Sequence, residues 1–381
     1  MARPPSLASG TWSSIVRSVS KVVDLEASAR HHKALQRVRK IRSAEALLRL
    51  ALIWGPGGQS LRASAALAQQ GGIGSFSDKA VEGRLRKMGD WLAHILSCLL
   101  AARIGHPPPA EAATLDLALV DGSVICSPGK GQDWRLHAQY EPGRGRFSDL
   151  TVTTTSTAER VSHTRIGRGR LLVMDRGYAR VRDFKAVLAE GSDFITRLSW
   201  RSVQLFDGPT GRDAKRIDLP ALLAKTAGRG ERVVWIHGIK QPLRLIIQAL
   251  PADAAAHQQA RRRRKASRNS HKIDPRTLQA AGFMLLLTSL PAERISADAV
   301  LACYRQRWQA EIGIKRLKSL GGLDELPSAD PALARTWLLA HLIAAVLTDD
   351  LAHEIVGFPP SADATARTGR TGRSGRTGRT G

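Results

Sequence analysis

Residues 114 to 199 alternate between apolar β-type runs and a helical run, and this stretch most constrains the fold. Three β-type runs come first, at a spacing that suits antiparallel neighbours; a fourth run, a helical segment and a fifth run follow. This order predicts an α/β fold built on a mixed sheet flanked by helices. The expected strands lie within residues 114–123, 133–140, 149–156, 170–178 and 193–199, and the expected helix covers 180–191. The first strand is expected to end in a turn at Asp121, and the fourth is expected to end at Asp175.

Residues 1–108 predict a helical domain. The run 43–54 has apolar side chains at helical spacing, and a short helix, a Gly-rich break and a second helix follow, with Ser77 or Asp78 as the expected cap of the second helix. This pattern is similar to a helix-turn-helix, although many helical hairpins share it. We expect a DNA-binding domain whose phosphate contacts come from Arg84, Arg86 and Lys87.

The rest of the chain divides by composition. A Pro-rich linker at 105–113 leads into the first part of the core, 114–199; a β-rich insertion at 200–290 then interrupts the core. Residues 261–276 carry eight Lys and Arg against one Asp, which predicts a basic loop that is either solvated or in contact with phosphates. We expect the core to resume at 291–360, with Ser296 as a helix cap, and the Arg/Thr/Gly tail 361–381 to be disordered, as either a nucleic-acid-binding tail or a chain end without an evolved role.

Positive charge points to a polyanionic partner. The formal net charge is +25, from 58 Lys and Arg against 33 Asp and Glu. Nucleic acid is the first choice for such a chain. Codon bias in a high-GC genome, which enriches Arg, is the alternative explanation.

Cysteines and apolar runs point to a cytoplasmic protein. Cys98, Cys126 and Cys303 are too widely spaced for a zinc motif or a disulfide framework. The N-terminus lacks the apolar core of a signal peptide. The longest apolar runs, 91–105 and 336–347, are too short to span a bilayer and predict buried helices, so no membrane association is expected.

The stretch "YRQRWQAEIGIKRLK" at 304–318 combines an apolar helix with a polar stripe. At about 100° per residue, four side chains fall within a stripe roughly 60° wide. These are Tyr304, Arg307, Glu311 and Lys318. One acidic group would then lie among cations on one face, although an ion pair with Lys315 is an alternative role for Glu311.

Two aspartates end apolar runs. Asp121 shares strand parity with Leu117 and Leu119, and Asp175 follows "LLVM", so both are expected on an apolar face. Each alone is more often a turn former. Together with Glu311 they form a candidate carboxylate cluster, which requires a divalent cation to offset its repulsion. Oxygen ligands favour Mg²⁺ or Mn²⁺, and two such ions stabilise the attacking and leaving oxygens of a phosphodiester displacement.

These residues resemble the DDE transposases of bacterial insertion sequences, in the "IS-four" family marked by a Tyr-Arg-Glu-Lys signature. The signature Y-x2-R-x3-E-x6-K fits Tyr304, Arg307, Glu311 and Lys318, while "VDGS" and "MDRGY" are similar to the family's two aspartate motifs. The resemblance covers roughly residues 40 to 350 and implies an RNase H-like core.

The resemblance also implies a reaction. Asp121, Asp175 and Glu311 would hold two Mg²⁺ ions for cleavage at transposon ends and 3′-OH strand transfer into target DNA. DNA contacts are expected from Tyr304, Arg307, Lys318, Arg176 and Tyr178. The implied partners are the terminal inverted repeats, target DNA and a second protomer in a homodimer, within the bacterial nucleoid. A truncated end-binding inhibitor and a stand-alone nuclease of the same fold are the alternatives.

Overall fold

The computed structural model describes residues 9–36, 40–104, 115–209, 214–319 and 321–356. The expected linker 105–113 and tail 361–381 lie outside these ranges. The chain forms two compact units. One comprises residues 1–105, 143–146 and 339–381; the other comprises residues 106–142 and 147–338.

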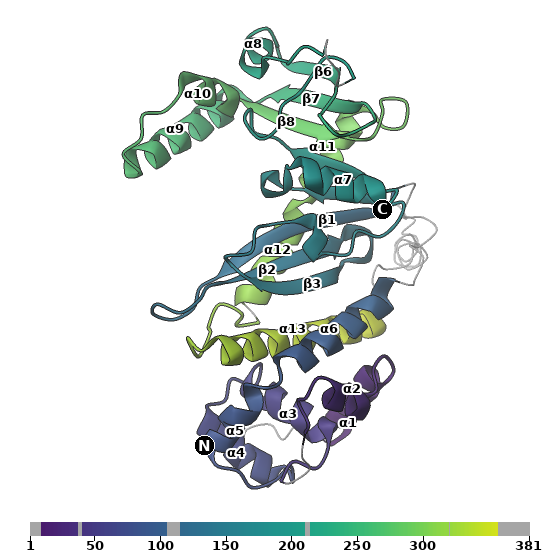
Figure 1. The fold of residues 1–381 in the computed structure, drawn as a ribbon, viewed down its shortest axis with the longest axis vertical. Helices are drawn as coiled ribbons and strands as arrows, with labels where there is room; N and C mark the ends of the chain where they lie inside the picture. The colour runs from purple at the N-terminus through teal and green to yellow at the C-terminus, as the bar shows by residue number, and fades with distance from the viewer. Residues whose placement is uncertain (1–8, 37–39, 105–114, 210–213, 320, 357–381) are drawn as a thin grey trace, which may run out of the picture. The chain divides into compact units, whose positions relative to one another are not determined.

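The second unit is built on an eight-stranded mixed sheet within the described residues, in the order β3-β2-β1-β4-β5-β8-β7-β6 (Figure 1). β1 pairs antiparallel with β2 and parallel with β4, which pairs parallel with β5. The predicted mixed α/β sheet is therefore confirmed. The strands are β1 (Leu117–Ile125), β2 (Trp134–Glu141), β3 (Arg146–Thr154), β4 (Leu171–Met174), β5 (Asp193–Arg197), β6 (Arg229–Val234), β7 (Leu243–Ala249) and β8 (Phe283–Thr288).

Strand alternation divides the apolar side chains of this sheet between two cores. Leu119, Val173 and Ile195 lie in the core that includes side chains of helix α11 (Ala297–Gln306) and helix α12 (Trp308–Ser319). The opposite face packs with Phe184 of helix α7 (Val181–Ala189), whose ring stacks on Phe194 of β5. The sheet is thus covered by helices on both faces.

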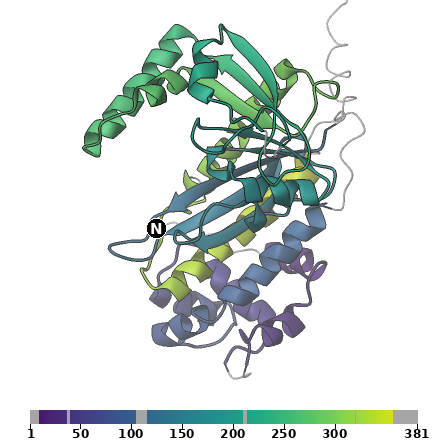
Figure 2. The same ribbon diagram turned by 45° about the horizontal axis from the view of Figure 1, so that its top comes forward.

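Residues 200–290 extend this same sheet. β8 pairs antiparallel with both β5 and β7, and β6 forms the edge next to β7. This segment also contains helices α8 (Leu219–Ala224), α9 (Ala252–Arg268) and α10 (Pro275–Ala281). Figures 1 and 2 show α9 and α10 side by side next to β8.

The expected basic loop is wrong in its conformation, because most of it is helical. Arg261 to Arg268 form the second half of α9, which has no buried residue. Ala, Gln, Arg and Lys are strong helix formers, and the helix spreads its charges around a solvated surface. Asp253 in the first turn and Lys265 and Arg268 in the last turn also complement the helix dipole.

The N-terminal part of the first unit is helical within its described residues, as the sequence predicts for residues 1–108. Its expected second helix is interrupted between Leu85 and Gly89, and Ser77 caps the first part by accepting a hydrogen bond from the Ala80 N–H at 3.3 Å. Fully buried Leu47, Trp91 and Leu342 belong to its core. The helices are α1 (Ser9–Ser20), α2 (Leu25–His31), α3 (Ala44–Trp54), α4 (Leu61–Gln70), α5 (Asp78–Leu85), α6 (Gly89–Ile104) and, from Leu339 on, α13 (Pro331–Val356).

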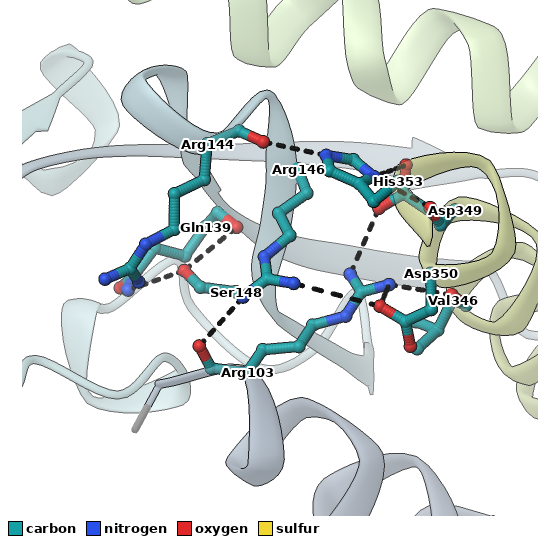
Figure 3. Close-up of polar contacts among 9 residues, drawn as sticks. All are labelled: Arg103, Gln139, Arg144, Arg146, Ser148, Val346, Asp349, Asp350 and His353. Atoms are coloured by element: carbon teal, nitrogen blue, oxygen red, sulfur yellow. Dashed lines mark hydrogen bonds and ion pairs between the residues drawn. The ribbon is translucent and has the colours of Figure 1, made fainter. Parts of the chain in front are cut away.

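A buried arginine joins α6 to the end of α13 in this unit (Figure 3). Arg103 is 3% exposed; it donates to the Val346 carbonyl at 2.7 Å and pairs with Asp349 at 3.2 Å and Asp350 at 2.7 Å. His353 contacts the Arg144 carbonyl at 2.8 Å. Charge-assisted bonds from a desolvated guanidinium fix these helices in one register.

The apolar run 336–347 is part of α13, which is longer than the run itself. By length and composition, Pro331–His353 of α13 is sufficient to cross a membrane, which corrects the expectation drawn from the run alone. However, 61% of its most apolar window is buried inside the protein. Such burial is typical of the core helix of a globular unit.

Candidate active site

Asp121 and Asp175 occupy neighbouring strand positions in the sheet. The parallel register of β1 and β4 ends with Val120 opposite Met174, so each aspartate is the next residue along its strand direction. Leu119 and Val173, two residues earlier, both lie in the core beneath α11 and α12. Strand alternation therefore directs both aspartates to the face covered by α11 and α12, as their parity predicts.

Asp121 does not end its strand, contrary to the sequence-based expectation. β1 continues to Ile125, because β2 goes on pairing with it after β4 has stopped: Asp121 pairs with Ala138 and Gly122 with His137. The Asp-Gly pair is therefore part of a strand rather than a turn. Asp175 does follow β4 directly and precedes the short helix η3 (Arg176–Tyr178).

The signature segment is two helices rather than one. α11 ends at Gln306 and α12 begins at Trp308. The backbone tightens at the junction, where the Arg307 N–H donates to the Tyr304 carbonyl at 3.1 Å and the Ala310 N–H donates to the Arg307 carbonyl at 3.0 Å. The prediction of one regular helix over 304–318 is therefore wrong at Arg307, and the polar stripe crosses a helix junction.

Arg307 joins two of the three candidate carboxylates. One guanidinium nitrogen donates to Asp121 Oδ2 at 3.0 Å, and the other pairs with Glu311 Oε1 at 2.6 Å. The Tyr304 hydroxyl donates to Asp175 Oδ1 at 3.3 Å. Tyr304 and Arg307 of the signature segment thus contact all three acidic residues, although Asp121 and Asp175 lie far from this segment in the sequence.

The carboxylates do not form a closed metal cage in this conformation. Among the described residues, no three acidic, His or Cys side chains are close enough together to hold a metal ion. The guanidinium of Arg307 supplies the neutralising charge between Asp121 and Glu311.

Burial is the main cause of the unusual electrostatics at Asp121. It raises the pKa of that carboxyl to about 6, against the opposing effects of Arg307 and the Gly122 N–H, and the negative charges of Glu311 and Asp175 raise it further. Burial followed by the charge of Asp175 raises the pKa of Tyr304 to about 12, so its hydroxyl stays protonated. A raised carboxyl pKa beside other carboxylates favours occupancy by an added cation.

Lys318 lies at the last turn of α12 and contacts the far end of β1. Its ammonium donates to the Val124 carbonyl and pairs with Asp324, both at 2.9 Å. The exposed Trp308, 65% accessible, lies next to Arg307 in the chain.

The two residues of the second aspartate motif that are expected to contact DNA, Arg176 and Tyr178, differ in their burial. Arg176 is half-buried and lines a pocket with Arg197 and Arg262. Tyr178 is only 1% exposed, and a Cβ on Gly122 would lie 3.3 Å from its hydroxyl. In this structure Tyr178 is a packing residue between the two motifs, and its expected DNA contact stays a prediction.

Glu159 is a site residue that the sequence does not reveal. Its carboxylate fills the space beside the glycines of both motifs: a Cβ on Gly177 would lie 2.1 Å from Oε2, and one on Gly122 would lie 3.7 Å from Oε1. Arg135 lies 3.6 Å from the same carboxylate. The Glu159 carboxylate would have to move aside for a side chain at position 177, and no local pattern around Glu159 signals this long-range contact.

The fold and the site together define a class of protein. A mixed sheet carries two aspartates on neighbouring parallel strands, a helical glutamate faces them, and cationic side chains surround the group. This combination is typical of enzymes that act on nucleic-acid phosphodiesters.

Comparison with known proteins identifies the family. Residues 116–347 match the family model described as transposase DDE domain. The chain is 38% identical over 360 residues to the putative transposase InsL for insertion sequence element IS186A of Escherichia coli strain K12. It is 37% identical over 361 residues to the transposase for insertion sequence element IS421 of Escherichia coli, and each alignment covers 92% of this chain and 96% of the relative. The chain belongs to the DDE transposase family and is a DNA transposase.

The family implies a divalent metal, and the three carboxylates suit one by their chemistry, although no three acidic, His or Cys side chains of the described residues are gathered closely enough to hold it in this conformation. The donors are all carboxylate oxygens, as hard cations such as Mg²⁺ prefer. One of them, at Asp121, has a raised pKa that a nearby cation would lower. The matching model spans all three carboxylates.

Proposed function

We propose that this transposase cuts DNA at the ends of its own insertion sequence and joins the freed 3′-OH to target DNA, with Asp121, Asp175 and Glu311 as its catalytic residues. The observation that carries the proposal is the register of β1 and β4, which puts Asp121 and Asp175 side by side, together with the Arg307 contacts that bring Glu311 to Asp121. An RNase H-like core and membership of the Tyr-Arg-Glu-Lys signature family are parts of the same proposal.

The three carboxylates would hold two Mg²⁺ ions. When bound, these ions supply charge stabilisation for the attacking and leaving oxygens of the phosphodiester. Arg307 then exchanges its carboxylate partners for DNA phosphate, for which its planar fork of donors is suited. Tyr304 orients Asp175 through its hydroxyl, and Lys318 contacts the backbone as a point charge.

We further propose how the remaining parts contribute. The partners are double-stranded terminal inverted repeats and target DNA, brought together by a homodimer in the cytoplasm at the nucleoid. The helical region 1–108, with Arg84 and Lys87 near the end of α5, binds the DNA ends; Arg86 is already paired with Glu82 at 2.7 Å. The core comprises 114–199 and 291–360, interrupted by the insertion 200–290.

A strand-transfer assay with matched terminal repeats and Mg²⁺ tests the proposal. Glu311→Gln should abolish cleavage while leaving end binding intact. Glu325→Gln, which neutralises an exposed glutamate later in the chain, is the matched control. Cleavage by the Glu311→Gln variant at the normal rate would refute the assignment. Wild-type end binding without cleavage would instead indicate an inhibitor, and cleavage without joining would indicate a nuclease.

A further inference from the structure

A basic pocket lies next to the acidic residues of the candidate active site. A surface pocket of about 300 Å³ is lined by residues from η3, from β5 and the loop after it, and from α9 and α10. Three arginines from distant parts of the sequence meet there: Arg176, Arg197 and Arg262. Arg176 immediately follows Asp175, and Arg197 directly follows Thr196, the β5 partner of Met174.

These three arginines have no acidic partner among the described residues, whereas their neighbours do. Arg201 and Arg276 both pair with Asp274, and Arg276 does so at 2.9 Å. Burial and then the charges of Arg176 and Arg197 lower the pKa of Arg262. Gathering like charges without a counterion is unfavourable, so the pocket is electrostatically prepared for an anion.

Neither aromatic residue of the pocket offers a free stacking surface, because Phe283 packs against the core and Trp200 already has stacking partners. The guanidinium of Arg201 lies 4.3 Å from the centre of the Trp200 ring, and that of Arg276 lies 5.1 Å from it. The indole N–H donates to Thr277 Oγ1 at 3.2 Å. Because Trp200 already has these contacts, the pocket is suited to recognise charge rather than a base.

We propose that the Arg176, Arg197 and Arg262 pocket binds one phosphodiester group of the DNA strand that runs past Asp175. The proposal rests on the proposed function for its ligand. It also gives α9 a role: a rigid helix holds Arg262 over the pocket while its other cations stay in solvent. Each guanidinium group can donate two parallel hydrogen bonds to phosphate oxygens. Three guanidinium groups around one phosphate fix both the position and the direction of the strand.

Neutral-phosphate scanning tests the pocket. Each phosphate near one terminal repeat is replaced in turn by an uncharged methylphosphonate, and equilibrium binding is measured without divalent metal, so cleavage plays no part. For the wild type, one replacement should weaken binding about tenfold, as expected for a lost charged hydrogen bond. Arg262→Ala should weaken binding of unmodified DNA, lower the salt slope by about 0.9, and abolish the sensitivity at that phosphate.

Matched variants separate this pocket from general basic charge. Arg264→Ala removes an exposed cation from the same helix without touching the pocket and should keep the wild-type scanning profile. Arg262→Lys should restore part of the affinity. Because α9 has no buried residue, its helicity and fold are expected to survive these changes, and far-UV circular dichroism checks this.

The scan also has clear contrary outcomes. Equal losses for Arg262→Ala and Arg264→Ala, or a phosphate profile that Arg262→Ala leaves unchanged, would overturn the pocket. A failed cleavage assay with this binding pattern intact would count only against the catalytic assignment, so the two proposals fail separately.

Discussion

Replacing Asp121 by Asn should stabilise the metal-free protein at neutral pH, because the native carboxylate is held in an unfavourable place. Burial raises its pKa from 3.8 to about 6. Each pKa unit corresponds to about 1.4 kcal/mol, so ionisation of Asp121 costs about 3 kcal/mol more in the folded state than in the unfolded state. Asn mimics the protonated form in size and avoids this cost.

The pH dependence follows from the sign of the shift. Below the unfolded value of 3.8, Asp121 is protonated in both states and has no effect on stability. Between that value and about 6 the folded state binds more protons, so the free energy of unfolding falls as pH rises, and the full penalty is present above about 6. The advantage of Asp121→Asn should therefore be about 3 kcal/mol at neutral pH and should disappear near pH 4.

Urea unfolding in buffer containing a chelator measures this difference across the pH range. Asp116→Asn is the control: it lies just before β1 and its carboxylate pairs with the buried Arg170 at 3.0 Å, so its loss should not stabilise the fold. An Asp121→Asn variant that is no more stable than wild type at neutral pH, or whose advantage does not change with pH, would refute the reasoning. Such a result would mean that Arg307 already compensates fully for the burial.

Three further outcomes are expected. Glu311→Gln should lower the Mg²⁺-dependent cleavage rate by at least about 10³-fold, equivalent to about 4 kcal/mol, with end binding retained in a mobility-shift assay. Gly177→Ala should destabilise the protein by at most about 1 kcal/mol, because its Cβ would lie 2.1 Å from Oε2 at the flexible end of Glu159, which can move aside, and adding Glu159→Ala should remove the loss in thermal unfolding. Arg103→Met should cost about 3 kcal/mol, because it removes the buried partner of Asp349 and Asp350 and leaves them only longer contacts with His353 and Arg146; a chemical-denaturation midpoint equal to wild type would contradict this.

Local sequence patterns were sufficient for much of the fold and part of the site. Strand parity correctly directed Asp121 and Asp175 to one face of the sheet, because side chains alternate over any short strand. The caps at Ser77 and Ser296 were also predictable, since each serine accepts a hydrogen bond from a backbone N–H three residues later. The catalytic assignments themselves stay predictions.

Tertiary pairing decided where several elements begin and end. Pairing with β2 carries β1 through Asp121, although Asp-Gly is locally a turn pattern. The backbone tightens at Arg307, which turns its side chain between Asp121 and Glu311. Neither result follows from periodicity: the extension of β1 depends on pairing with β2, and the contact of Arg307 with Asp121 joins residues far apart in the sequence.

By itself, then, the sequence determined most element types, with α9 as an exception, and also the polarity of their faces and the signature spacing, since these depend on propensities and on interactions within a few residues. Only the tertiary structure decided that Glu159 fills the space beside the motif glycines and that Arg262 joins Arg176 and Arg197. These contacts span long stretches of chain, and their geometry is fixed by the packing of the whole sheet.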